Sequence, residues 1–371
     1  MNTLKFFFQI TMKVTCNKRS TCESQILVSV VIPVYNAEQW LDAALESICQ
    51  QTWRESLEVS IYDDASTDSS RYIIDKWKIV LEKLLVKVTI GSNKTGKPSG
   101  VGAAKNAAIR QSNGKYICFF DSDDVMLSKR LELQLKVALA LDWNTIIGCN
   151  FERVPDDSTP RYTTWHNSLS QIQLSTQIYT SFGPTLIQPT WFCSRDLIEY
   201  LGYFDEIGKG HPEDLTFFYK HLKNNGKLYR VQETLLLYRY HENAASFSVS
   251  EETIWDIRLS HLEVEVLSKW QNFTIWNAGK QGRRFYRSLT QKDRGKVLAL
   301  CDVDEKKISK GEYRCELLKD GDCVPIVPII HFKDAVPPMV ICVKINLTKG
   351  EFEKNLSSLN LVEGTDYVLF S

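Results

Sequence analysis

The feature that most constrains the fold is an alternation of short apolar runs with longer amphipathic stretches between residues 28 and 120. Continuous apolar runs are typical of parallel strands buried on both faces, and amphipathic stretches are typical of helices that cover a sheet. The order predicts a β-α-β-α-β-α-β unit, the first half of a doubly wound α/β domain. The predicted strands are Val28–Val34, Leu57–Tyr62, Val86–Ile90 and Tyr116–Phe120, and the predicted helices are Ala37–Gln50, Ser69–Leu85 and Gly102–Gln111.

Beyond Leu127 the pattern is mixed, and a long amphipathic helix near Glu251–Trp270 precedes a new strand at Phe273. A length of 371 residues suits two domains. We expect an N-terminal extension (1–25), a nucleotide-binding α/β domain (26–250), a connecting helix (251–271) and a smaller Rossmann-like α/β domain (272–371). Within the mixed part the predicted helices are Leu127–Leu141, Asp196–Leu201 and Pro212–Asn224, and the predicted strands are Thr145–Phe151, Lys227–Val231 and Leu235–Tyr240.

Composition excludes few functions. Lys+Arg and Asp+Glu both number 45, so the net charge is zero, which argues against a protein that coats nucleic acid but is compatible with a local basic patch. The 10 cysteines contain no CxxC pair, which favours reduced core thiols over a disulfide framework. The apolar run Leu4–Ile10 is broken by Lys5 and Gln9 and is too short for a membrane span, so we expect a cytoplasmic protein.

Acidic residues gather at three places in the pattern. Asp63–Asp68 follows the second predicted strand, Asp121–Asp124 follows the fourth, and Glu213 and Asp214 open a predicted helix. Each group alone could be a turn, a solvated loop or favourable charge at a helix N-terminus. Together they occupy the edge of an open α/β sheet where ligands bind, and this joint placement indicates a functional site.

Carboxylates in this arrangement suit the transfer of a sugar from a nucleoside diphosphate. The leaving diphosphate develops negative charge, which a hard divalent cation held by carboxylates can neutralise, and a further carboxylate can deprotonate the acceptor hydroxyl. A nucleotidyltransferase would share the architecture and the metal, but it opens with a glycine-rich basic loop where this chain has Pro33–Ala37. A non-catalytic binding module is a further alternative, which intact Asp121, Asp123 and Asp214 disfavour.

Residues 28 to about 250 resemble the inverting GT-A glycosyltransferases of family 2. The resemblance implies the GT-A fold, a nucleotide-sugar donor and a divalent metal, Mn²⁺ or Mg²⁺. The matching pieces are V-S-V-V-I-P-V-Y-N-A (28–37), Y-D-D-A-S-T-D (62–68), G-V-G-A-A-K-N-A-A-I (100–109), F-F-D-S-D-D (119–124), P-E-D (212–214) and L-Y-R-Y-H-E-N-A-A-S (237–246).

The resemblance also implies roles for individual residues. Asp214, with Glu213 beside it, would be the catalytic base of a single inverting displacement, and Asp123 and His241 would hold the metal. The acceptor would contact Trp191 and Glu213. The residues expected to bind the nucleotide-sugar are Pro33, Tyr35, Asp63, Asp64, Lys105, Asp121, Asp123 and Arg239.

Two positions depart from the family pattern. Ala65 stands where the family usually has glycine, and Lys105 stands where it usually has arginine. Lysine keeps the positive charge but lacks the bidentate fork of a guanidinium, which weakens the expected contact with phosphate.

Longer strings resemble one vertebrate member of the family more closely. That resemblance implies UDP-galactose as donor and the cyclopentenediol of queuosine, at the wobble position of cytosolic tRNA-Tyr, as acceptor. The alternative is a UDP-GlcNAc-dependent β-1,3-N-acetylglucosaminyltransferase that acts on a galactose-terminated glycan. The strings are I-I-G-C-N-F-E-R (146–153), P-T-W-F-C-S-R (189–195), P-E-D-L-T-F-F-Y (212–219) and F-T-I-W-N-A-G-K-Q-G-R-R-F-Y-R-S-L (273–289).

The last hundred residues contain half of a dinucleotide-binding fingerprint. A predicted strand, Phe273–Trp276, is followed by the turn Gly279–Gly282, and Asp302 ends the next predicted strand. Asn277 stands where the first glycine of the fingerprint belongs, so a structural or docking domain is favoured over an NAD site. Basic residues follow this turn and form either a solvated face or a surface for tRNA phosphates. They are Arg283, Arg284, Arg287, Lys292, Arg294 and Lys296.

Overall fold

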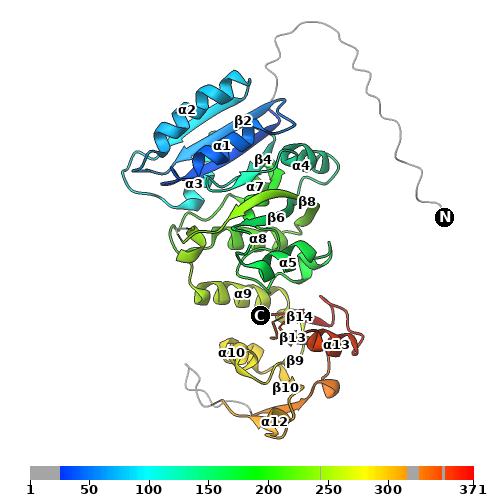
Figure 1. Ribbon diagram of the computed structural model, residues 1–371. Coiled ribbons are helices and arrows are strands. Elements are labelled where there is room, and N and C mark those ends of the chain that lie inside the picture. The colour runs from blue at the N-terminus through cyan, green and yellow to red at the C-terminus, as the bar shows by residue number, and fades with distance from the viewer. Residues whose placement is uncertain (1–25, 243, 316–325, 345–346) are drawn as a thin grey trace, which may run out of the picture.

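The structure is a computed structural model that describes residues 26–242, 244–315, 326–344 and 347–371. The predicted N-terminal extension, residues 1–25, lies outside the described residues. Two sheets occupy the two ends of the molecule, and the long helix α9 (Glu251–Glu265) lies between them (Figure 1). The predicted class, a larger α/β unit followed by a smaller one, is confirmed.

The first unit is built on one sheet. Its strands are β1 (Val28–Val34), β2 (Leu57–Asp63), β3 (Lys87–Ser92), β4 (Tyr116–Phe119), β5 (Val125–Met126), β6 (Thr145–Val154), β7 (Phe192–Ser194) and β8 (Lys227–Arg239). They form an 8-stranded sheet in the order β3-β2-β1-β4-β7-β6-β8-β5. The first four strands are parallel, as the alternation with helices predicts, and β7 and β5 run antiparallel to their neighbours.

Helices cover this sheet. They are α1 (Leu41–Cys49), α2 (Ser70–Lys83), α3 (Val101–Arg110), α4 (Arg130–Ala138), α5 (Pro160–Ser168), α6 (Gln173–Thr176), α7 (Arg195–Leu201) and α8 (Glu213–Lys223). The first helix begins at Leu41, one turn later than predicted, because the backbone N–H groups of Ala37 and Glu38 donate to Ser70 and Asp68. These bonds hold the end of β1 against the loop after β2.

The long strand β8 replaces two strands that the sequence predicts separately. Its pairing with β6 shifts register twice, so that Cys149 lies opposite Val231 while Phe151 lies opposite Leu236. The additional residues form a bulge in β8. Because the bulge interrupts the apolar pattern, the sequence predicts two strands instead of one. The continuous strand pairs with β5 and ends at Arg239, whose backbone N–H donates to Asp124. His241 follows two residues later.

The second unit has a 6-stranded sheet in the order β11-β12-β10-β9-β13-β14. Only the pair of β11 and β12 is antiparallel among its described pairings. Its strands are β9 (Phe273–Trp276), β10 (Val297–Asp302), β11 (Glu312–Tyr313), β12 (Val327–His331), β13 (Met339–Ile341) and β14 (Tyr367–Leu369), and its helices are α10 (Lys280–Ser288), α11 (Gln291–Arg294), α12 (Glu305–Ile308) and α13 (Glu351–Ser357).

The two units share a hydrophobic core. One cluster of buried apolar side chains runs from Phe119 and Trp191 in the first unit through Leu259 of α9 to Phe285 and Phe370 in the second. Polar contacts follow the same path, since the Tyr179 hydroxyl lies 2.8 Å from Nδ1 of His261 and Arg284 pairs with Glu251 at 2.6 Å. The helix predicted as a connector therefore packs against both units.

Two further sequence expectations concern cysteines and membrane spans. Cys118, Cys149, Cys193, Cys301 and Cys342 are free, buried thiols, as predicted for core cysteines. In the part of the chain that the structure describes, no helix has both the length and the apolar character needed to cross a membrane.

Candidate active site

The predicted site residues of the first three parallel strands meet at one edge of the sheet. Val34, at the end of β1, lies opposite Asp63, at the end of β2, and Pro33 lies opposite Tyr62. Tyr35 follows β1 with 50% of its side chain exposed. Tyr35 is therefore accessible at the edge where the nucleotide is expected, and Asp63, at the same edge, is 6% exposed.

The adjacent residues Asp63 and Asp64 have different environments. Asp64 is 2% exposed, and its oxygens accept bonds from the backbone N–H groups of Ser99 and Gly100 and from Nδ2 of Asn93. Through these bonds Asp64 holds the loop before α3, and its expected contact with the nucleotide stays a prediction. Asp63 uses Oδ1 to accept the N–H of Ser66, which closes its own turn.

The second acidic group forms a compact cluster. Ligand oxygens of Asp121, Asp123 and Asp124 lie within 4.8 Å of one another. Asp124, which the sequence analysis did not single out, is fully buried and accepts the backbone N–H of Arg239 at 2.9 Å. Its position beside two other aspartates in D-S-D-D is the signal that could have identified it.

The strand end of β8 supplies the basic side of this cluster. Nε2 of His241 lies 2.8 Å from Oδ2 of Asp123, and the Arg239 guanidinium donates to the Asp123 carbonyl at 2.8 Å. Trp40, which the sequence analysis also missed, packs under both, 5.0 Å from the Arg239 guanidinium and 5.4 Å from the His241 ring. The predicted metal pair, Asp123 and His241, is therefore brought together.

The cluster fits a divalent cation. Oδ1 of Asp121, Oδ2 of Asp124 and Nδ1 of His241 are buried without a hydrogen-bond partner. Burial, opposed by Lys105 and reinforced by Asp123, raises the pKa of Asp121 to about 6, and burial with the same neighbour raises the pKa of Asp124 well above its usual range. A cation with oxygen ligands would satisfy these atoms and offset the repulsion among the carboxylates.

Glu213 and Asp214 lie at the start of α8, beside α3. Nζ of Lys105 lies 2.8 Å from Oε1 of Glu213, and the two residues are 3% and 8% exposed. The ammonium of Lys105 is engaged by Glu213, and its expected contact with the donor phosphates stays a prediction. Burial, followed by the charge of Glu213, raises the pKa of Asp214 to about 6, a value suited to a general base near neutral pH.

The close approach of α3 to the segment before α8 requires a glycine. A Cβ at Gly102 would lie 2.2 Å from the Asp205 carbonyl oxygen. Asn106, one turn further along α3, exchanges hydrogen bonds with the backbone N–H and carbonyl of Phe204. The small residues of α3 thus position Lys105 next to Glu213.

Trp191 belongs to a cluster of buried apolar side chains. Its side chain is 0% exposed and packs among the rings of Phe204, Phe217 and Phe218. Nε1 donates to the Leu186 carbonyl at 2.7 Å, so the polar atom is satisfied inside the core. Trp191 therefore packs in the core of the first unit, and its expected contact with the acceptor stays a prediction.

The second unit resembles a dinucleotide-binding domain in topology but not in its loop. Asn277 accepts the N–H of Gly279 at 2.7 Å, and Asp302 accepts the N–H of Ala278 at 2.9 Å. In a dinucleotide site such backbone N–H groups would point at the pyrophosphate. Because the N–H groups of Ala278 and Gly279 donate to side chains of the same unit, a structural role for this unit is favoured over NAD binding.

The basic residues on α10 are also engaged within the protein. Arg283 donates to the Ala278 carbonyl, Arg284 pairs with Glu251, and Arg287 donates to the Tyr313 hydroxyl. These contacts join α10 to its own unit and to α9, which weighs against an exposed face dedicated to RNA phosphates.

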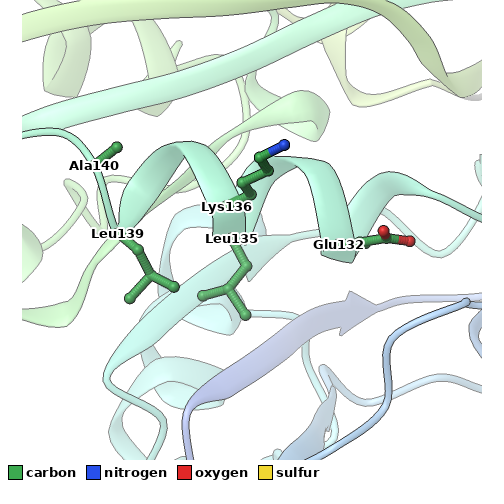
Figure 2. Close-up of a pocket in the computed structure, with 5 residues that line it drawn as sticks. All are labelled: Glu132, Leu135, Lys136, Leu139 and Ala140. Carbon is green, nitrogen blue, oxygen red and sulfur yellow. The ribbon is translucent and has the colours of Figure 1, made fainter. Parts of the chain in front are cut away.

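A surface hollow lies along α4 (Figure 2). One helix and the residues that follow it supply its lining, which includes none of the predicted site residues. The lining residues are Glu132, Leu135, Lys136, Leu139 and Ala140.

The first unit is similar to known glycosyltransferases. Residues 29–202 match the family model described as Glycosyl transferase family 2. The chain is similar to UDP-Glc:alpha-D-GlcNAc-diphosphoundecaprenol beta-1,3-glucosyltransferase WfgD of Escherichia coli, with 32% identity over 132 residues, which cover 36% of this chain and 48% of WfgD. It is also similar to Poly(ribitol-phosphate) beta-N-acetylglucosaminyltransferase TarS of Staphylococcus aureus (strain MW2), with 26% identity over 246 residues, 65% of this chain and 40% of TarS. The chain spans less than half the length of these two relatives.

A solved structure gives the same answer for the fold. The crystal structure of S. aureus TarS 1-349 in complex with UDP-GlcNAc matches with a TM-score of 0.51 and 19% identity, covering 71% of this chain and 70% of that chain. Together with the strand order, the structural match shows that the first unit has the GT-A fold, and residues 29–202 are similar to glycosyltransferase family 2.

Proposed function

We propose that this chain is a metal-dependent, inverting galactosyltransferase that transfers galactose from UDP-galactose to the cyclopentenediol of queuosine in tRNA-Tyr. The observation that carries the proposal is the cluster of Asp121, Asp123 and Asp124 next to the buried pair of Lys105 and Glu213, with Asp214 beside that pair. The site thus combines a place for a cation with a separate carboxylate of raised pKa.

In this mechanism Asp214 acts on the acceptor. Its carboxylate takes the proton of the acceptor hydroxyl as the hydroxyl oxygen forms a bond to the anomeric carbon, and the bond from that carbon to the diphosphate oxygen breaks. A divalent cation held by Asp123, Asp124 and His241 would neutralise the charge that develops on the leaving UDP. Because the sugar is displaced once and no enzyme carboxylate bonds to it, an α-linked donor gives a β-linked product.

The other site residues bind the donor or position these groups. Pro33, Tyr35 and Asp63 would line the edge for the nucleotide, and Asp121, a member of the acidic cluster, would bind the donor beside the cation. Asp123 and His241 hold the metal together with Asp124, and Arg239 fixes the backbone at Asp123. Glu213 fixes the start of α8, where Asp214 is the next residue.

The donor class and the acceptor have different support. Two similar proteins are described with UDP-linked sugars, WfgD by its name and TarS by its complex with UDP-GlcNAc, and this supports a UDP-sugar donor. Galactose and queuosine are supported by the resemblance of residues 146–153, 189–195, 212–219 and 273–289 to one vertebrate glycosyltransferase. Since that acceptor is a cytosolic tRNA, we propose that the enzyme acts in the cytoplasm.

A second candidate is transfer of N-acetylglucosamine to a galactose-terminated glycan. The observation that favours it is the similarity to TarS, which is named as a beta-N-acetylglucosaminyltransferase. The two candidates differ in donor and acceptor, so one set of assays separates them.

The decisive experiment incubates the purified protein with UDP-galactose, Mn²⁺ and queuosine-containing tRNA-Tyr and analyses the tRNA nucleosides by mass spectrometry. A hexose added to queuosine, absent with Asp214→Asn, is the expected result. Hydrolysis of UDP-galactose without modified nucleoside would keep the donor and reject the acceptor. Transfer of N-acetylhexosamine from UDP-GlcNAc to a galactose-terminated glycan would favour the second candidate instead.

A further inference from the structure

An arginine surrounded by aromatic rings lies on the strand next to the catalytic edge. The guanidinium carbon of Arg153, on β6, is 3.9 Å from the ring centre of Tyr238, 5.6 Å from that of Tyr240 and 6.0 Å from that of Tyr162. The ring of Phe151 lies behind it at 5.6 Å. Arg153 is directly opposite Tyr238 in the β6–β8 pairing, and Tyr240 follows the last residue of β8, with its backbone N–H donating to the Val154 carbonyl at 2.9 Å.

The N–H groups of Arg153 make few hydrogen bonds within the protein. Its Nε is buried without a partner, and Nη1 has a single long bond of 3.5 Å to the Arg239 carbonyl. Within the described part of the chain, no carboxylate forms an ion pair with Arg153. A stacked guanidinium with unsatisfied N–H groups beside a catalytic edge is suited to receive hydrogen-bond acceptors of a ligand.

The ring cluster also adjoins the catalytic carboxylates. The pKa of Tyr162 is raised to about 12, chiefly by burial, and the charge of Asp214 adds to the rise. Burial also raises the pKa of Tyr238, and the negative charges of Asp124 and Asp121 add to this rise. Tyr162 and Tyr238 therefore lie within electrostatic range of the base and of the metal cluster, on the same side as Arg153.

On its other side the cluster opens to solvent. Tyr240 is 41% exposed and Phe247 is 55% exposed, and their ring centres are 5.5 Å apart. Exposed aromatic rings that continue a partly buried ring cluster give a large flat ligand a surface to stack on as it enters.

We infer that Arg153, Tyr162, Tyr238 and Tyr240 form the subsite that receives the planar nucleobase of the acceptor nucleoside, an inference that rests on the proposed function. Proteins recognise an unstacked base by stacking it on aromatic side chains and on arginine planes, with hydrogen bonds to its edge. The subsite would stack the base of the acceptor on Tyr240 and offer N–H groups of Arg153 to its oxygen or nitrogen atoms. The diol that the base carries would then extend toward Asp214.

The test measures galactose transfer to queuosine-containing tRNA-Tyr and, separately, hydrolysis of UDP-galactose without tRNA. The variants are Arg153→Met, Arg153→Lys, Tyr240→Ala and Tyr240→Phe. Arg71→Met and Tyr200→Ala are matched controls, since Arg71 is an exposed arginine on α2 and Tyr200 a tyrosine with 62% exposure on α7. We expect Arg153→Met and Tyr240→Ala to raise the KM for tRNA about tenfold, and Tyr240→Phe and both controls to leave it unchanged. Arg153→Lys should behave like Arg153→Met, because the ammonium cannot stack as a plane.

Each outcome bears on the inference. A raised KM for tRNA with unchanged hydrolysis and unchanged melting temperature supports the subsite. Wild-type transfer with an unchanged KM in Arg153→Met and Tyr240→Ala rejects the subsite and leaves the proposed function in place. Equal loss of transfer and hydrolysis assigns these side chains to folding and also rejects the subsite. A wild-type protein that modifies only a glycan acceptor rejects the proposed function and the nucleobase subsite together.

Discussion

Lys105 and Glu213, which are 108 positions apart in the chain, form a buried ion pair with 2.8 Å between Nζ and Oε1. The pair joins α3, whose preceding loop is fixed by Asp64, to the first turn of α8, where Asp214 lies. It also places a positive charge near Asp121. One lysine therefore lies next to both Asp121 and the start of the helix that carries Asp214, which suits it to position the two groups.

Lys105→Met should destabilise the protein by about 3 kcal/mol, because Glu213 would be left as an unpaired charge in the interior. The measurement is the free energy of unfolding from urea titration. The double variant Lys105→Met/Glu213→Gln should recover most of the loss, since it removes both charges. A single variant as stable as the wild type would show that the ion pair does not hold α3 and α8 together.

Asp214→Asn should lower kcat for transfer about 100-fold or more, since an amide cannot take the proton of the acceptor hydroxyl. Binding of UDP-galactose should persist, because the nucleotide edge and the metal cluster are unchanged. The rate of transfer can be measured by tRNA nucleoside analysis, and the binding of UDP-galactose can be measured by calorimetry. Normal turnover by this variant would assign the base to another residue.

The pH dependence of transfer should report the same group. The pKa of Asp214 is raised to about 6, and its active form as a base is the deprotonated carboxylate. The rate should therefore be full above this value and should fall as the pH drops through about 6. A rate profile measured from pH 5 to pH 8, with melting temperatures recorded at each pH to exclude unfolding, checks this. A rate independent of pH across this window would contradict it.

Much of the first unit could be predicted from the sequence because its signals are local. The strands β1, β2 and β4 are mostly apolar and buried on both faces, and carboxylates lie at or just after the ends of β2 and β4. The edge of the sheet that binds ligands could be predicted for the same reason, because parallel strands bring their ends together.

The parts that could not be predicted depend on contacts distant in the chain. Asp63 and Asp64 are indistinguishable in the sequence. Asp64 accepts hydrogen bonds from the backbone N–H groups of Ser99 and Gly100 only because the loop that carries them folds against it. The partner of Lys105 and the burial of Trp191 likewise depend on where α8 packs. No local pattern near these residues carries that information.

Ala65→Gly should stabilise the protein by about 1 kcal/mol, since Ala65 has a left-handed backbone with φ of 66° that costs an L-residue energy but suits glycine. Thermal and urea unfolding of the two proteins would measure the difference, and transfer activity should be unchanged because the loop keeps its shape. A destabilised variant would mean that the greater freedom of glycine in the unfolded chain outweighs the relief of strain.

Asp123→Ala should abolish the effect of Mn²⁺ on donor binding. Asp123 contributes a carboxylate to the cluster and is the hydrogen-bond partner of His241, so its loss removes one ligand and frees the other. Calorimetric titration with UDP-galactose, with and without Mn²⁺, should show tighter binding with the metal in the wild type and no difference in the variant. Asp142→Ala is the matched control, because Asp142 is an exposed aspartate paired only with Lys227 among the described salt bridges. If Asp123→Ala kept the metal effect while Asp121→Ala lost it, the cation would be held by Asp121 and Asp124 without His241.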